Sequence, residues 1–477
     1  MRVHAFASSA ILALALMSGA CAAGPMSAPA TLQEEGGPQV TVTRDGDHLN
    51  IDYRFGRDVP VWAFQDSALE QDSRQPWRPR QWTVETPGVV MERRGHYDII
   101  RSTDGGSVPR EVRFRVRPQA VDLEAEYPTL LFSNGAVALP TRQLDVFALP
   151  SAQAAEQVPD DLNRVRLDGS PSRVTWRDEN GPVLFNGRRR DELATTDERS
   201  YVLLGEATVT PGDGLSTVMD PNLPPWIGEE IRGFAPRVGH YYRDRLGAPG
   251  SGGDTPIVMV AWNGPTESMT SMGGSVLPGL IVMSFEGRGV TSPQPEIVER
   301  SRWFIGHEGA HFWLGQTVRY AFADEAWITE GGADLMAVRA LKALDANYDD
   351  QAELQSEVDD CVNLARQPIA QAGARGEHRA YYACGAVFAL AAEGAQRQRT
   401  GGDWFDFLRP LLRQPDGVLS REEWLTALTR TSRDPSLRGD VERMLDQGAS
   451  DPSAVIARLF QRTGVAFRMI DGRVVLS

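Results

Sequence analysis

The chain has 477 residues, of which 41% are hydrophobic and 24% are charged, a composition typical of a soluble globular protein with two or three domains. Its formal net charge is -15 at pH 7, and no basic stripe runs along the sequence. This charge balance argues against a nucleic-acid-binding protein, so we expect no nucleic acid among its partners.

Residues 1–22 are predicted to be an export leader. Arg2 precedes a short apolar stretch at residues 10–17, and small residues follow at 18–23. The apolar stretch is too short to span a bilayer, and no later segment is long enough either. We favour lipoprotein-type processing, which would attach the chain to a membrane through lipidated Cys21, although the same small residues would serve an ordinary signal peptidase. The mature protein is therefore expected in the periplasm or cell envelope.

After a linker over residues 23–37, residues 38–205 are predicted to form an antiparallel β domain, a sandwich or a saddle. The alternating apolar residues on both sides of Asp45-Gly46 are typical of a hairpin. Residues 112–116 alternate between apolar residues and arginine, which predicts a strand with one face in water. For the tryptophans of this range we favour core packing over a binding surface: Trp62, Trp77, Trp82 and Trp176.

From about residue 206 the pattern changes, so that the whole chain is predicted to be an α+β multidomain protein. Residues 256–262 and 279–284 are apolar runs that predict buried strands. A helix is expected to start near Pro295, because proline suits a first helical turn. We assign residues 206–400 to one domain and residues 401–477 to a mostly helical region that ends in a hairpin at Asp471-Gly472.

The helix expected after Pro295 contains an H-E-x-x-H motif, His307-Glu308-Gly309-Ala310-His311. Four residues are about one helical turn, so both imidazoles project from one face and can occupy two corners of a zinc tetrahedron. Glu308 lies between them, in place to act on the metal's water. Glu330, 19 positions after His311, would supply a third ligand from a second helix. Three protein ligands and one open position describe a catalytic Zn2+ site.

Asp334 is predicted to support this site from the second helix. It lies four residues after Glu330 and therefore shares its helical face. Histidines that bind a metal usually donate their other N–H to a carboxylate, which fixes the tautomer and the ring direction. We assign this role to Asp334; the alternative is a solvated aspartate on the helix surface.

The motif extends in both directions, with HEGAHFWLGQTV at residues 307–318 and WITEGGA at residues 327–333. These segments resemble the membrane alanyl aminopeptidase family of gluzincin zinc metallopeptidases. The resemblance implies a thermolysin-like catalytic domain over residues 206–400 and hydrolysis of peptide bonds with Glu308 as general base. Residues 382–387 (YACGAV) are similar to the family's Tyr-x-Lys-Gly-Ala segment, with cysteine at the usual lysine. This similarity implies that Tyr382 stabilises the oxyanion; the alternatives are Tyr381 and a purely structural tyrosine at 382.

One segment departs from the family pattern. Family members carry Gly-x-Met-Glu-Asn on an edge strand, and its glutamate holds the free α-amino group of the substrate. This chain has GGSVLPGLI at residues 273–281, which places Val276 at the position of that glutamate. An aliphatic side chain cannot neutralise an ammonium group, so the zinc chemistry carries over but the exopeptidase specificity does not. Glu267 or Glu286 could substitute in space.

Apart from Cys21, the chain has two cysteines, Cys361 and Cys384, in predicted helices separated by residues 367–376. In an oxidising compartment such a pair predicts a disulfide between antiparallel helices, and two buried free thiols are the alternative. The sequence as a whole predicts an exported zinc metallopeptidase that acts on peptide or protein substrates. Its alternatives are an aminopeptidase with a relocated acidic anchor and a non-enzymatic, peptide-binding envelope lipoprotein on a peptidase scaffold.

Overall fold

The computed structural model describes residues 37–124, 126–250, 256–267 and 271–477. The predicted leader, its Cys21 and residues 23–36 of the predicted linker lie outside the described residues. Among the described residues, no helix combines the length and the apolar character needed to cross a membrane.

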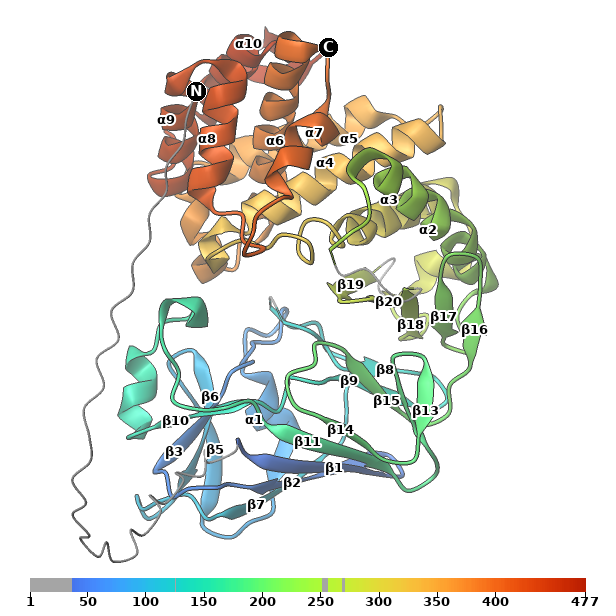
Figure 1. The fold of residues 1–477 in the computed structure, drawn as a ribbon, viewed down its shortest axis with the longest axis vertical. Coiled ribbons are helices and arrows are strands. Elements are labelled where there is room, and N and C mark those ends of the chain that lie inside the picture. Colours follow the sequence, from blue (N-terminus) through green and yellow to red (C-terminus); the bar gives the residue numbers. More distant parts are fainter. Residues whose placement is uncertain (1–36, 125, 251–255, 268–270) are drawn as a thin grey trace, which may run out of the picture. The chain divides into compact units, whose positions relative to one another are not determined.

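The N-terminal part of the described chain is built from three β-sheets, drawn in blue to green in Figure 1. The first sheet has the order β14 (Leu193–Thr195), β11 (Arg173–Asp178), β1 (Gln39–Asp45), β2 (His48–Arg54), β7 (Glu111–Val116) and β4 (Trp82–Val84). The second has the order β10 (Val146–Leu149), β3 (Val61–Phe64), β6 (Tyr97–Ser102) and β5 (Val89–Arg94). The third has the order β13 (Arg188–Arg190), β12 (Val183–Phe185), β15 (Tyr201–Leu204), β9 (Val137–Pro140) and β8 (Leu130–Leu131).

The predicted antiparallel character of this part is confirmed, with one exception. Strands β1 and β2 form the predicted hairpin, in which Asp45 lies opposite His48 and Gly46 adopts the left-handed φ of 60° that the turn requires. Strand β1 pairs with β11 in parallel, however, because the chain crosses over between these two strands. Local alternation cannot predict this pairing, since a strand has the same pattern in either direction.

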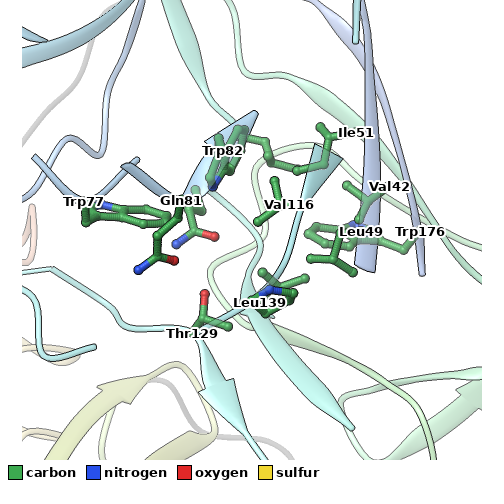
Figure 2. A pocket seen from close by; sticks show the side chains of 13 residues that line it. Val42, Leu49, Ile51, Trp77, Gln81, Trp82, Val116, Thr129, Leu139 and Trp176 are labelled. Carbon is green, nitrogen blue, oxygen red and sulfur yellow. The ribbon is translucent and has the colours of Figure 1, made fainter. Parts of the chain in front are cut away.

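The tryptophans of the β-sheets pack in the core, as predicted: Trp62, Trp77, Trp82 and Trp176 are all at most 5% exposed. Trp77 is the first residue of the short helix α1 (Trp77–Gln81), and Trp82 is its C-cap residue. Figure 2 shows a small pocket lined in part by Trp77, Trp82 and Trp176. The volume that the centre of a water molecule could occupy in this pocket is about 10 Å³. This space suits about one water. In the described part of the chain, the buried Nε2 of Gln81 has no hydrogen-bond partner, so we expect that water to serve it.

The next part of the described chain forms a mixed sheet of the order β16 (Val209–Pro211), β17 (Ser216–Met219), β18 (Ile257–Trp262), β20 (Leu280–Glu286) and β19 (Ser271–Leu277). The two predicted strands are β18 and β20, which pair in parallel. Strand β19 is an edge strand and pairs with β20 in antiparallel orientation. One face of this sheet shares an apolar cluster with the third β-sheet, through residues such as Leu130, Leu203, Met259 and Val282.

Helix α2 (Pro225–Leu246) lies between β17 and β18 in the sequence. Four helices labelled in Figure 1 come after β20: α3 (Pro295–Ala310), α4 (Trp327–Leu344), α5 (Asp350–Leu364) and α6 (Arg379–Thr400). The C-terminal part contains α7 (Trp404–Leu411), α8 (Arg421–Ser432), α9 (Pro435–Asp446), α10 (Pro452–Thr463) and the hairpin β21 (Phe467–Ile470) and β22 (Arg473–Leu476). The predicted helix start at Pro295 and the predicted terminal hairpin are confirmed. A disulfide joins Cys361 of α5 to Cys384 of α6, so the predicted bridge between two helices is confirmed and the alternative of two free thiols is wrong. The boundaries at residues 205 and 400 remain our proposal.

Candidate metal centre

The two histidines of the H-E-x-x-H motif lie at the C-terminal end of α3, where His311 is the C-cap residue. Their rings are 4.7 Å apart between centroids, as expected for positions i and i+4 of a helix. The helix is fixed by its buried residues, which include Phe304, Ile305 and Ala310. The imidazole of His307 is itself buried, with 4% of its surface exposed.

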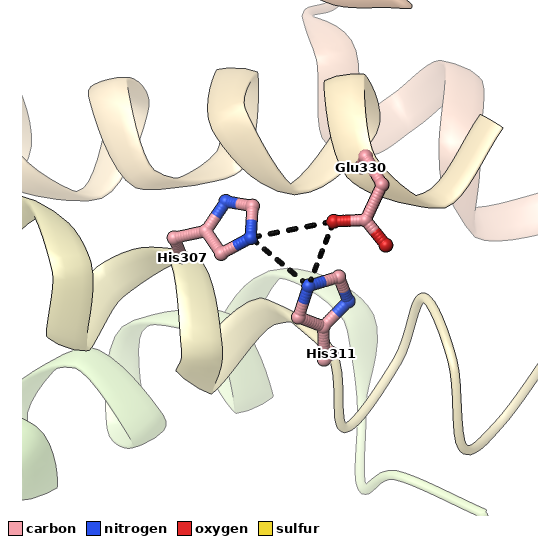
Figure 3. Close-up of side chains that lie close together, drawn as sticks. All are labelled: His307, His311 and Glu330. Carbon is pink, nitrogen blue, oxygen red and sulfur yellow. Dashed lines mark hydrogen bonds and ion pairs between the residues drawn. The ribbon is translucent and has the colours of Figure 1, made fainter. Parts of the chain in front are cut away.

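Glu330 lies in the first turn of α4, and its carboxylate points at both imidazoles (Figure 3). Its Oε2 is 3.6 Å from Nε2 of His307 and 3.4 Å from Nε2 of His311. The two Nε2 atoms are 3.0 Å apart. One potential ligand atom from each residue thus lies within 4.8 Å of the others. The structure brings together all three residues that the sequence predicted as ligands.

Hydrogen bonds at the other ring nitrogens fix both tautomers. Nδ1 of His307 is 2.7 Å from Oδ1 of Asp334, and Nδ1 of His311 is 2.7 Å from the carbonyl oxygen of Leu314. Both partners are acceptors, so each Nδ1 carries the proton and each Nε2 presents a lone pair. Two lone pairs that face each other at 3.0 Å, beside a carboxylate, repel one another unless a cation lies between them. The donor set therefore fits a zinc ion.

The charges around the site also favour a cation. Burial alone would lower the pKa of both His307 and His311. The carboxylates of Asp334 and Glu330 oppose this effect and raise the pKa of His307. The carboxylate of Glu330 likewise raises the pKa of His311. Burial would raise the pKa of Glu330, but the two imidazoles lower it below its usual range. A positive charge, carried by a proton or by a metal ion, is stabilised at the point where the three side chains meet.

Glu308 is buried next to the edge strand β19, with 5% of its surface exposed. A Cβ atom on Gly274 of that strand would lie 2.8 Å from Oε1 of Glu308 and 2.7 Å from the ring of Phe304. The absence of a side chain at Gly274 therefore makes room for the carboxylate. Burial raises the pKa of Glu308 above its usual value, although the two histidines oppose this shift. A raised pKa suits a general base that works near neutral pH.

The structure distinguishes the two candidate tyrosines of α6. The ring of Tyr382 stacks on the imidazole of His307, with 5.7 Å between centroids and 24° between planes. The charge of Glu330, together with burial, raises the pKa of Tyr382 well above its usual value, so its phenol keeps the proton. The hydroxyl of Tyr381 instead accepts a hydrogen bond from the Gly373 backbone N–H at 3.1 Å. The side chain beside the predicted ligands is thus Tyr382.

Glu330 and Tyr382 lie close together because α4 and α6 cross at two glycines. A Cβ atom on Gly331 would lie 2.1 Å from the backbone carbonyl carbon of Gly385, and one on Gly385 would lie 2.2 Å from the carbonyl oxygen of Trp327. Both distances are far shorter than van der Waals contact. The two helices can therefore approach this closely only if neither position carries a side chain.

Val276 lies on β19 and is buried, two residues from Gly274 and so on the same face of the strand. The structure places neither proposed substitute beside it. Glu267 is exposed and forms an ion pair with Arg288. Glu286 lies opposite Ser271, and five residues of strand, about 17 Å, separate that position from Val276.

Comparisons with known proteins give matches at the level of structure. No family model and no curated protein matches the sequence. Native leukotriene A4 hydrolase from Saccharomyces cerevisiae aligns with 87% of this chain and 68% of its own, with a TM-score of 0.50 and 12% identity. The yeast enzyme in complex with bestatin aligns with 89% of this chain and 71% of its own, at the same score and identity. The chain has the fold of leukotriene A4 hydrolase. An M1 zinc metallopeptidase from Deinococcus radiodurans aligns with 87% of this chain and 94% of its own, with a TM-score of 0.45 and 15% identity.

The shared fold with leukotriene A4 hydrolase confirms the predicted fold class, an N-terminal β part followed by an α+β part and C-terminal helices. Other features of the site were missed from the sequence. The carbonyl group that binds His311 belongs to the backbone of Leu314, in the turn after α3. Every residue type carries such a group, so the sequence does not indicate which carbonyl will accept the hydrogen bond. Gly331 and Gly385 belong to the WITEGGA and YACGAV segments of the sequence, and nothing in their spacing indicates that they are in contact.

Proposed function

We propose that this protein is an exported zinc metallopeptidase that hydrolyses peptide bonds. One observation supports the proposal above all: the Nε2 lone pairs of His307 and His311 and the carboxylate of Glu330 point to one place. The tautomers of both histidines are fixed by hydrogen-bond acceptors at their Nδ1 atoms. The fold shared with a hydrolase supports the same reaction class. The disulfide between Cys361 and Cys384 supports export, because such bonds persist in oxidising compartments.

His307, His311 and Glu330 would hold the zinc ion. Zinc bound in such a site polarises a carbonyl group and lowers the pKa of a coordinated water to about 7. The buried carboxylate of Glu308 would take a proton from the attacking water and deliver it to the leaving amine. Tyr382 keeps its phenolic proton and lies against His307, so it would donate a hydrogen bond to the oxyanion that develops on the substrate carbonyl.

We expect Tyr382→Phe to lower kcat by about 10²- to 10³-fold, because loss of one oxyanion donor has effects of this size. The matched control is Tyr381→Phe, which removes a hydroxyl bound to the Gly373 backbone N–H and should leave kcat within about threefold of wild type. Steady-state kinetics on an internally quenched peptide measure both. An equal loss of kcat in the two variants would refute the assignment of Tyr382.

The specificity that we propose is endopeptidase cleavage. Val276 is an aliphatic residue on the face of β19 that also carries Gly274, beside Glu308. A substrate ammonium bound next to Val276 would lose its hydration without gaining a carboxylate partner, which is unfavourable. A peptide bond in the interior of a chain carries no such charge, so internal bonds are the expected substrates.

The alternative function is an aminopeptidase whose acidic anchor has moved. Glu267 pairs with Arg288, and Glu286 lies opposite Ser271, five residues of strand from Val276. The anchor of such an aminopeptidase would therefore have to come from another acidic residue.

The deciding experiment maps the cleavage products of a peptide pool, half with free and half with acetylated N-termini, by mass spectrometry. We expect internal cleavage in both halves, its loss when zinc is removed with a chelator, and its recovery when zinc is added back. Trimming of free N-termini alone would favour the aminopeptidase. No cleavage in either half, with zinc bound, would favour a peptide-binding envelope protein, for which Cys21 remains the proposed lipid anchor.

A further inference from the structure

Asp334 is the most deeply buried acidic group of the metal centre, with 1% of its surface exposed. One of its oxygens, Oδ1, accepts the hydrogen bond from His307. The other, Oδ2, is buried and has no hydrogen-bond partner among the described residues. The cationic group that approaches it is Nη1 of Arg379, at 3.7 Å. A buried carboxylate needs such compensation, since an uncompensated charge in the interior is strongly destabilising.

Arg379 is held in this position by two acidic residues of α5. Its Nε donates to Oδ2 of Asp360 at 2.9 Å, and its Nη2 donates to Oε1 of Glu357 at 2.8 Å. Glu357 is 2% exposed, whereas the side chain of Asp360 is 40% exposed. Burial and the nearby charge of Asp334 raise the pKa of Glu357 to about 8, although Arg379 opposes the shift. Arg379 thus lies among three carboxyl groups, those of Asp334, Glu357 and Asp360.

The helices that carry this arrangement are cross-linked nearby. The disulfide joins Cys361, next to Asp360 on α5, to Cys384, five residues after Arg379 on α6. Tyr382 lies between Arg379 and Cys384 in the sequence of α6. Hydrogen bonds and a covalent bond therefore tie α5 to the same turns of α6 that present Arg379 to Asp334 and Tyr382 to His307.

We propose that Arg379 is a positioning residue of the metal centre: it fixes Asp334 through Oδ2, and Asp334 in turn fixes the ring and tautomer of His307. The inference rests on the zinc site of the proposed function. Arg379 is the first residue of α6, and its guanidinium contacts Asp334 and not the three predicted ligands. Outer partners of metal-bound histidines typically change metal affinity by 10- to 100-fold when they are removed.

The test is the zinc dissociation constant of the full chain, measured by competition with a chromophoric chelator. We expect Arg379→Met to weaken zinc binding by at least about tenfold, and Arg379→Lys to restore most of the affinity because the positive charge returns. The matched control is Arg397→Met, the same change on the same helix, at a residue that pairs with the buried Glu393 at 3.3 Å. That control should leave the zinc affinity unchanged.

Equal zinc affinity in Arg379→Met and wild type would overturn the proposal, and so would a loss that Arg379→Lys does not restore. If Arg379→Met does not fold, the double variant Glu357→Ala with Asp360→Ala removes both side chains of α5 that accept hydrogen bonds from Arg379 and leaves Arg379 itself unaltered. Weaker zinc binding in this variant supports the proposal, and unchanged binding overturns it. These outcomes are separate from those of the proposed function, which fails if wild type binds no zinc or hydrolyses no peptide.

Discussion

Glu308→Gln is expected to lower kcat for peptide hydrolysis by about 10³-fold while zinc stays bound. General acid–base catalysis contributes about 10²- to 10⁴-fold, and Glu308 would act both as base toward the attacking water and as acid toward the leaving amine. Glutamine has nearly the same shape, so it fits the space beside Gly274. It cannot accept the proton, however, and since Glu308 is not a ligand its replacement leaves His307, His311 and Glu330 in place.

Measurement of this effect combines single-turnover kinetics with metal analysis of the same samples. The matched control is Glu299→Gln, an identical change at an exposed position of α3, which should leave kcat unaltered. Wild-type kcat in Glu308→Gln would refute the role of Glu308. Loss of zinc together with activity would instead show that the carboxylate is needed to hold the metal centre.

Gly331→Ala is expected to lower the free energy of unfolding by about 3 kcal/mol and kcat/KM by about 10²-fold. The new methyl group would lie 2.1 Å from the backbone of Gly385, and backbone atoms cannot rotate away as a side chain can. The helices α4 and α6 must therefore separate, at a cost at the upper end of that for overpacked cores. These helices carry Glu330 and Tyr382, and a displacement of about 1 Å at an active site can cost about 10²-fold in rate.

The control for this prediction is Gly233→Ala in α2, where no described heavy atom lies within 4 Å of the added methyl group apart from its chain neighbours and the helix's own backbone. Alanine is the better helix former, so this change should raise the free energy of unfolding by about 0.5–1 kcal/mol. Chemical denaturation and steady-state kinetics on both variants provide the comparison. If Gly331→Ala were as stable and active as wild type, the close crossing of α4 and α6 would be wrong.

Several features of the candidate site could be predicted because they depend on one helix at a time. His307 and His311 are one turn apart, and so are Glu330 and Asp334, and helical periodicity alone puts each pair on one face. The hairpin at Asp45-Gly46 is similarly local, since the turn residues and the alternation of neighbouring strands determine it. Such local patterns can be read from the sequence because they do not depend on what packs against the helix or strand.

The sequence by itself thus determined the H-E-x-x-H motif, the helices that carry it and Glu330, and the order of the β and α parts. Only the tertiary structure decided between Tyr382 and Tyr381, because neighbouring residues of α6 point in different directions and the position of α4 selects one of them. It also decided the crossing at Gly331 and the approach of Arg379 to Asp334. These contacts join separate helices, and the distance between two helices depends on how their whole faces pack, which no local pattern of residues encodes.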